Sequence, residues 1–252
     1  ALDNAETREE RDQIRFNAVD LTTRRSYNFT NVRKNPTSGA KQRFYSISNF
    51  NISYSFNEVT RRNQTYTEFL EKTWKGSLGY NFSPETKFWE PFRKIGKSKW
   101  LTLIRDFNIG LRPQSIGARG DLDRFYGRTI NRANDNPFTI VPILYNKNFT
   151  FNRFYDLRWD ITRNLKFDLN ANAMARIDEN PGLVNQNERP GQSDTILSNL
   201  LGFGRMTSYT QAANLNYTLP LNKIPITDWI NASVRYSANY GWNTAPPIFQ
   251  SI

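Results

Sequence analysis

Apolar and polar residues alternate along most of the chain, and the stretch NISYSFNEV at residues 51–59 shows this clearly. Aromatic and aliphatic side chains occupy one parity of this stretch, while Asn and Ser occupy the other. Because neighbouring side chains of a β-strand point to opposite faces of a sheet, the alternation predicts a strand with one apolar and one polar face. The question it raises is which face meets water.

The same alternation predicts eight strands and no long helix. In chain order they cover residues 26–33, 44–57, 73–82, 101–112, 148–161, 165–177, 207–219 and 229–242. In the second range the apolar parity changes near Ser48, which predicts a β-bulge there. The sequence TILSNLLGFG at residues 195–204 is expected to contain a helical turn.

Alternating strands occur both in soluble β-sandwiches and in transmembrane barrels, where the polar parity lines an aqueous lumen. Three features favour the barrel. The predicted strands have about the length that a tilted membrane strand needs, aromatic residues gather near strand ends, and the connections alternate in length. We therefore expect an all-β fold, an antiparallel transmembrane β-barrel segment of about eight strands that belongs to a larger barrel. A soluble secreted β-sandwich that acts as a binding module, and a stand-alone small outer-membrane barrel, are the alternatives.

On the barrel interpretation each parity has its own surroundings. The residues expected to face the lumen are Asn51, Ser53, Ser55, Asn57, Lys75, Ser77, Asn81, Asp156, Arg158, Asp160, Lys166, Asp168 and Asn170. The residues expected to face lipid or a partner are Ile52, Tyr54, Phe56, Trp74, Leu78, Tyr80, Phe82, Leu157, Trp159, Phe167, Val234, Tyr236, Tyr240 and Trp242. Arg153 breaks the apolar parity, and near the bilayer midplane it would cost about 2 to 4 kcal/mol unless it reaches water or a partner.

A tight turn at residues 162–164 sets the register of the two strands that it joins. It places Asp160 opposite Lys166 and Arg158 opposite Asp168. Each opposite-charge pair across two strands contributes about 0.2 to 1 kcal/mol. The polar parity is therefore expected to be organised by pairing.

We treat residues 1–252 as a single β-barrel segment with an N-terminal lead-in at residues 1–20. Residues 113–147 and 178–206 are expected to form long external loops, whereas the turn at 162–164 and the connection at 220–228 are expected to be periplasmic. The basic connection at 83–99 is long for a periplasmic turn. Because the chain begins without Met or an apolar signal core, we expect a trimmed mature chain or an internal piece of a longer protein.

Composition narrows the function classes further. The hydrophobic fraction is 38%, and no apolar run approaches the roughly 18 to 20 residues of a membrane helix, which excludes a helical membrane protein. An aromatic content of 14% excludes a disordered chain. The absence of Cys and His excludes disulfides, thiolate zinc sites and nucleophiles activated by His. The net charge of +11 favours anionic partners, but the basic residues are spread along the chain without an RNA-binding signature, so no nucleic-acid partner is expected.

No motif predicts an enzyme, a metal site or a cofactor. Asp121 and Asp123 have a spacing found in calcium loops, but the arginines around them favour a turn held by Asp–Arg pairs. Asp156, Asp160 and Asp168 each have a basic neighbour, so cross-strand pairing explains them better than acid–base catalysis. The N-x-S/T triplets are what alternation produces when Asn, Ser and Thr fill the polar parity.

Four longer phrases resemble a known family. They are RSYNFTNVRK at residues 25–34, LEKTWKGSLGYNFSPETKFWEPF at 70–92, DFNIGLRPQSIGARGDLDRFYGR at 106–128 and LPLNKIPITDWINASVRYSANYGW at 219–242. Together they resemble a segment of the SprA/Sov family, the very large outer-membrane translocon of the type IX secretion system in Bacteroidetes, which also supports gliding motility.

This resemblance implies a single-chain barrel of exceptional strand number in the outer membrane of a Gram-negative bacterium. Folded secretion substrates would pass through its lumen. The implied partners are the remainder of the barrel chain, a PorV-type outer-membrane barrel, a periplasmic plug protein, secreted protein substrates and outer-membrane lipid. The present chain would be one internal part of that barrel wall.

Overall fold

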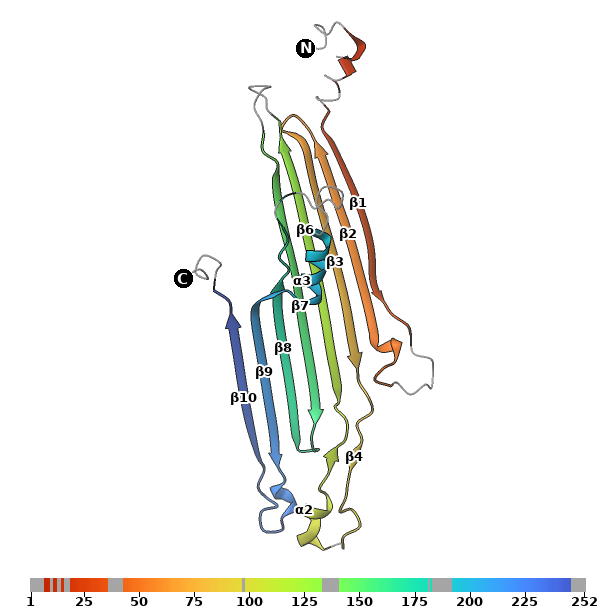
Figure 1. The fold of residues 1–252 in the computed structure, drawn as a ribbon. Coiled ribbons are helices and arrows are strands. Elements are labelled where there is room, and N and C mark those ends of the chain that lie inside the picture. Colours follow the sequence, from red (N-terminus) through yellow and green to blue (C-terminus); the bar gives the residue numbers. More distant parts are fainter. Residues whose placement is uncertain are drawn as a thin grey trace.

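Eight long strands form one antiparallel sheet, in the order β1-β2-β3-β6-β7-β8-β9-β10 (Figure 1). The computed structural model describes residues 7–9, 11–12, 15, 19–35, 43–96, 98–132, 141–180, 182 and 192–245. The eight long strands pair antiparallel in chain order, so the predicted antiparallel all-β class is confirmed. No described helix has the length and apolar character needed to cross a membrane.

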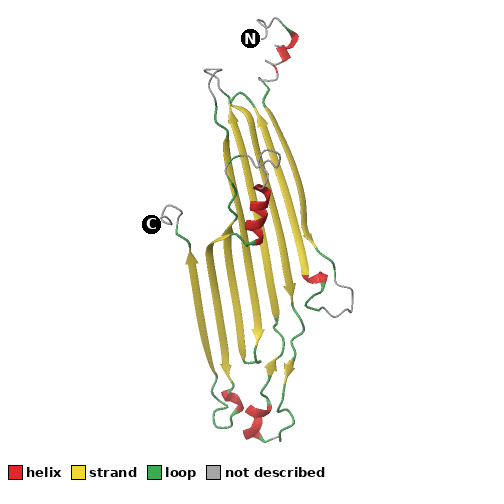
Figure 2. Cartoon of the chain, in the orientation of Figure 1, coloured by secondary structure: helices red, strands yellow, loops and turns green. Residues whose placement is uncertain are grey.

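The long strands of the sheet are β1 (Leu21–Val32), β2 (Phe50–Arg62), β3 (Tyr66–Phe82), β6 (Ser115–Asn131), β7 (Leu144–Asp160), β8 (Leu165–Arg176), β9 (Arg205–Leu219) and β10 (Ala232–Asn243). A separate two-stranded pair consists of β4 (Phe88–Trp89) and β5 (Ile109–Gly110). Short helical segments occupy the connections (Figure 2). They are η2 (Ile47–Asn49), η3 (Lys99–Leu101), α2 (Thr102–Arg105), α3 (Gln192–Leu201) and η4 (Leu221–Lys223).

The parity change near Ser48 has a different cause from the predicted bulge. Residues Ile47–Asn49 form the 3₁₀ turn η2, and β2 begins only at Phe50. The buried amide of Asn49 donates hydrogen bonds to the carbonyl oxygens of Arg43 and Phe44 at 2.8 and 3.1 Å. A residue in such a turn no longer alternates with the strand that follows it, which explains the change of parity.

The largest correction concerns the middle of the chain. The predicted strand at 101–112 is instead the helical segments η3 and α2 followed by the short strand β5. Conversely, the predicted external loop at 113–147 contains all of β6 and the first residues of β7. The predicted number of eight long strands agrees with the structure only because the wrong strand at 101–112 is offset by the missed strand β6.

Strands β1 and β10 are the two edges of the sheet. In the described part of the chain neither edge pairs with the other or with any further strand, so the sheet is open. The described residues also contain no second sheet beyond the β4–β5 pair, and thus no sandwich. Both alternatives of the sequence analysis, a sandwich and a closed eight-stranded barrel, differ from this arrangement.

The connections leave the sheet at two ends, called upper and lower as in Figure 1. The chain leaves the sheet at the upper end after β2, β6 and β8, and at the lower end after β1, β3, β7 and β9. Among its connections, each end has a very short one, at 63–65 or 161–164, and a long one, at 177–204 or 83–114. The predicted alternation of short and long connections is therefore wrong, and connection length does not distinguish the ends.

Part of the predicted loop at 178–206 lies outside the described residues. Its described part includes α3, which is longer than the predicted helical turn and is seen in front of the sheet in Figure 1. The chain then turns through Phe203 and Gly204, both with positive φ. A Cβ on Gly204 would lie 2.8 Å from the backbone oxygen of Arg176, so this turn requires glycine.

Candidate functional site

The strand register sorts the side chains into two faces. Residues opposite each other on antiparallel strands share a face, and the pairing continues from β1 to β10. One face, called the polar face, holds every residue predicted to face a lumen. The other, called the apolar face, holds every residue predicted to face lipid or a partner. The register also places Asp160 opposite Lys166 and Arg158 opposite Asp168, as predicted.

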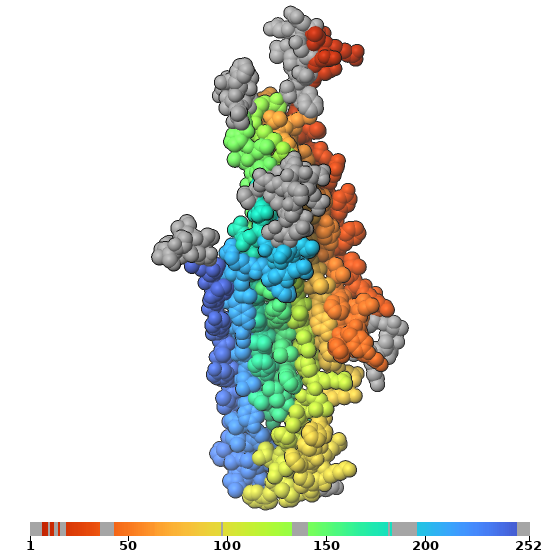
Figure 3. Space-filling model, in the orientation of Figure 1, coloured from red at the N-terminus to blue at the C-terminus, as the bar shows by residue number. Residues whose placement is uncertain are grey.

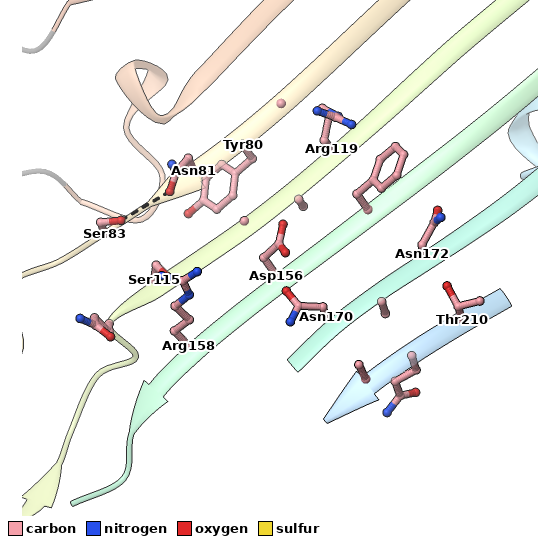
Figure 4. A pocket seen from close by; sticks show the side chains of 18 of the residues that line it. Tyr80, Asn81, Ser83, Ser115, Arg119, Asp156, Arg158, Asn170, Asn172 and Thr210 are labelled. Atoms are coloured by element: carbon pink, nitrogen blue, oxygen red, sulfur yellow. Dashed lines mark hydrogen bonds between the residues drawn. The ribbon is translucent and has the colours of Figure 1, made fainter. Parts of the chain in front are cut away.

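The polar face is concave. A hollow of about 1150 Å³ takes its lining from strands β2 to β10, which requires that the sheet curves around it. Figure 4 shows Asp156 and Asn170 side by side on neighbouring strands, with Arg119 farther along β6. Small residues such as Gly117 and Ala212 also line it. The hollow is thus a broad, polar trough rather than a closed pocket.

Ion pairs on the polar face join neighbouring strands or residues of one strand. Lys75 Nζ lies 3.4 Å from Asp123 Oδ2, and Arg158 Nε lies 4.0 Å from Asp168 Oδ1. Asp121 accepts a 2.7 Å hydrogen bond from the hydroxyl of Ser77. These partners are partly or largely exposed, so each pair contributes about 1 kcal/mol or less. Among the described residues, however, Asp156, Asp160 and Lys166 form no ion pair, so the register alone does not complete the predicted pairing.

In two places on the polar face, an arginine guanidinium lies over an aromatic ring. The guanidinium carbon of Arg119 lies 4.4 Å from the ring centre of Phe154, and that of Arg61 lies 5.3 Å from the ring centre of Phe69. Arg119 also pairs with Asp121 at 3.1 Å. A cation over a ring adds attraction and covers apolar surface. These two rings are therefore partly covered, whereas Met174 on the same face stays exposed.

The apolar face is largely uncovered within the described chain. Phe29 is 60% exposed, Leu78 53% and Tyr240 60%, although all three are large apolar side chains. Aromatic rings contact one another across the strands, as in the row Tyr27, Phe56 and Trp74, with centroid distances of 6.2 and 5.6 Å. Figure 3 shows the strands as one continuous surface, with the residues of α3 across its middle. Few apolar side chains of the described residues are buried, so within the described chain this face is not packed as a core.

Charged residues end the apolar band toward the upper end. One row beyond Tyr27 and Phe56, Glu58 pairs with Lys72 at 3.0 Å and with Arg25 at 3.8 Å, and all three lie on the apolar parity. The strands β3, β6 and β7 would each span about 56 Å at the usual rise per residue, whereas a membrane band is about 25 Å tall. Apart from Arg153, the lower and middle part of the face carries the apolar band.

Two arginines on the apolar parity are covered by residues of the connection between β8 and β9. Arg124 forms a two-pronged contact with Glu179, at 2.7 and 3.0 Å, and the Glu179 side chain is only 4% exposed. The guanidinium of Arg153 lies near the rings of Phe151 and Phe203, at 5.3 and 5.2 Å from their centres. Arg153, which breaks the apolar parity, thus has local partners.

Outside the strands, electrostatics lowers the pKa of two carboxyl groups. At Asp178 a hydrogen bond from Arg205 is the main cause. At Asp106 partial burial by itself raises the pKa, but hydrogen bonds and charge from Lys223 and Arg105 outweigh it. Asp178 ties its connection to strand residues Arg176 and Arg205, whereas Asp106 ties its own connection to the neighbouring one through Lys223.

The carboxylates considered for chemistry are all on strands. Asp121 and Asp123 lie on β6 and not in a turn; Asp121 pairs with Arg119, as predicted, but Asp123 pairs with Lys75 of β3 rather than with an arginine. The described residues contain no group of three or more acidic, His or Cys side chains that could hold a metal ion. What the arrangement offers chemically is an extended hydrated surface.

Sequence reasoning missed the contribution of β6 to this surface. Arg119, Asp121 and Asp123 supply central charges of the polar face, but they were assigned to a loop. The signal was present in the apolar parity of Ile116, Ala118 and Leu122, which the glycines between them obscured. No protein-family model matches the chain, and no curated protein matches it.

Proposed function

We propose that the chain is one arc of the wall of a very large outer-membrane channel, through which folded secreted proteins leave the cell. The observation that carries this proposal is an open sheet whose concave face is polar and whose other face is apolar and exposed. The resemblance to the SprA/Sov family supplies the class of channel, the type IX translocon, and its role in gliding motility where that occurs.

The apolar face supports a lipid or protein environment. In water, an exposed surface of this kind is unfavourable by about 25 cal/mol for each Å² that could be buried. In a bilayer the same residues, among them Leu78, Leu157 and Val234, are the ones that lipid chains solvate. The row of rings at Tyr27, Phe56 and Trp74 followed by charged residues fits the border between lipid and water.

The open edges support a larger barrel. β1 and β10 each carry a row of backbone groups without strand partners in the described residues, and all of β1 is exposed. Free edges of this length promote uncontrolled pairing, so proteins cover or pair them. An eight-stranded barrel would fill its interior with side chains. Pairing of β1 and β10 with the remainder of the barrel chain instead leaves the trough open to a wide lumen.

The polar face suits a conduit for folded proteins. Asn, Ser and Thr side chains with locally paired charges bind water and offer no large apolar patch to a passing protein. Arg119 and Arg61 reduce the exposed area of the aromatic rings beneath them. The PorV-type barrel on the apolar side and a plug protein at the periplasmic end remain the partners that the resemblance implies.

Apolar substitutions on the polar face test the proposal. Ser53→Leu and Asn170→Leu, each introduced into the parent protein, should lower the export of secreted substrates several-fold, because the leucine side chains would form apolar contacts with the passing protein. The amount of folded parent protein in the outer membrane should stay the same. The matched control is Leu169→Val, next to Asn170 on the apolar face.

Export that is unchanged across both sites, with the parent protein present at normal level, would contradict the lumen role. A parent protein that stays soluble without detergent would contradict the membrane location itself. In that case the polar trough would be a binding surface of a secreted protein.

A further inference from the structure

The lower end of the apolar face contains a cavity. It has a volume of about 620 Å³ and lies between the segment at α2 and strands β8 to β10. Its lining is mainly apolar and includes Leu103, Phe107, Leu165, Leu215, Val234 and Tyr236. A concave apolar site with a few polar groups at one side is the usual form of a small-molecule site.

A second hollow, rich in cations, adjoins this cavity. It has a volume of about 740 Å³, shares Asp106 with the apolar cavity, and is lined by Arg93, Lys94, Arg105 and Arg163. Arginine and lysine side chains are the groups with which proteins bind phosphate.

The two carboxylates in this region do not balance its cations. Glu90 pairs with Arg163 at 2.6 Å and with Arg93 at 3.7 Å. Asp106 pairs with Lys223 at 3.2 Å and with Arg105. Lys94 is exposed, and none of the carboxylates of the described residues lies within ion-pair distance of it. Excess positive charge therefore remains beside the apolar cavity.

Exposed tryptophans surround the same end. Trp89, Trp100 and Trp229 lie in the two connections at 83–114 and 220–231, and their exposed fractions are 54%, 64% and 78%. Indole rings concentrate at the level of lipid headgroups, because they combine an apolar body with a polar N–H. These residues indicate that the lower end lies at a membrane surface.

We propose that the lower end of the sheet binds an anionic phospholipid, with an acyl chain in the apolar cavity and the phosphate against the neighbouring cations. The inference rests on the proposed function, since it needs lipid on the apolar face. A soluble anion would use only the cationic hollow, and a zwitterionic lipid would gain less from the excess charge. The adjoining apolar and cationic sites together fit a single molecule with both kinds of group.

The test uses the parent protein, purified in detergent and titrated with phosphatidylglycerol or phosphatidylethanolamine, with bound lipid counted by native mass spectrometry. The unchanged protein should bind phosphatidylglycerol at least about tenfold more tightly than phosphatidylethanolamine. The double substitution Lys94→Gln with Arg105→Gln should remove most of this preference. Lys75→Gln with Lys166→Gln, which removes the same charge from the polar face, is the matched control and should leave the preference unchanged.

A second variant tests the apolar cavity. Val234→Trp fills it from the edge strand and should weaken the binding of both lipids several-fold. If phosphatidylglycerol binds equally to the unchanged protein and to the Lys94 and Arg105 variant, the proposed site is wrong. If inorganic phosphate displaces the lipid fully and Val234→Trp has no effect, the site binds a soluble anion only, which also overturns it.

These outcomes are separate from the fate of the proposed function. A parent protein in the outer membrane that exports normally but shows no preference for phosphatidylglycerol rejects the lipid site alone. Substitutions Ser53→Leu and Asn170→Leu that leave export unchanged reject the lumen role, whatever lipid the lower end binds.

Discussion

The same strands form both faces of the sheet, yet charged and aromatic side chains find opposite surroundings on the two faces. On the polar face, several charges are paired with neighbours and the ring of Phe154 lies under Arg119. On the apolar face, rings such as Tyr27 and Phe56 contact one another and stay exposed, while Arg124 and Arg153 are covered by a connection. The side chains of the polar face thus suit contact with water, whereas those of the apolar face require lipid or a protein partner to cover them.

The largest predicted effect comes from placing a charge on the apolar face. Leu78→Arg should destabilise the folded protein in a bilayer by about 2 to 4 kcal/mol, because the guanidinium would enter lipid. Asn81→Arg, on the polar face of the same strand, is the control and should change stability by about 0.5 kcal/mol or less. The measurement is denaturant unfolding of the parent protein in lipid vesicles. Equal losses for the two variants would mean that the faces do not differ in solvent.

A smaller effect is expected from uncovering an aromatic ring on the polar face. Arg119→Gln should cost about 0.5 to 1 kcal/mol of stability and should slow export, because Phe154 becomes accessible to passing protein. Adding Phe154→Ser should restore the export rate, measured as secreted substrate per folded parent protein.

The control for this pair is Lys75→Gln, which also removes a cation beside an aspartate but exposes no ring. If Lys75→Gln slows export as much as Arg119→Gln, or if Phe154→Ser fails to restore it, the charge and not the covered ring is what matters.

The smallest effect is expected at the exposed ion pair between Arg158 and Asp168. The pair is 4.0 Å long, and its side chains are 70% and 39% exposed. Asp168→Asn should therefore change the free energy of unfolding by about 0.5 kcal/mol or less, as measured with urea in detergent micelles. A loss above about 1 kcal/mol would show that the pairs hold the polar face together rather than only balancing its charge.

The sequence was most informative where alternation was strict. The predicted strand at 165–177 agrees with β8, which ends one residue earlier at Arg176. The register across residues 161–164 followed from the shortness of the turn. The alternation also assigned every proposed lumen and lipid residue to its face. These features are local, since the parity of a strand follows from the extended backbone alone.

The failures arose where local signals were ambiguous. The segment at 100–112 fits two patterns. Its apolar residues have the spacing of a helix face at Trp100, Leu103, Ile104 and Phe107, but apolar residues also occupy most of its odd positions, as in a strand. In β6, the glycines and aspartates had the composition of a loop. The strand forms because β3 and β7 hydrogen-bond to it along both sides, and Phe151 packs over Gly120.

By itself, the sequence determined which side chains share a face, because a strand presents successive residues to opposite sides. Only the tertiary structure decided that the polar face is the concave one, that β1 and β10 remain edges, and that Phe203 and Glu179 cover Arg153 and Arg124. Curvature, edge pairing and these contacts depend on groups far apart in the chain. Their energies therefore cannot be obtained from the pattern of any one segment.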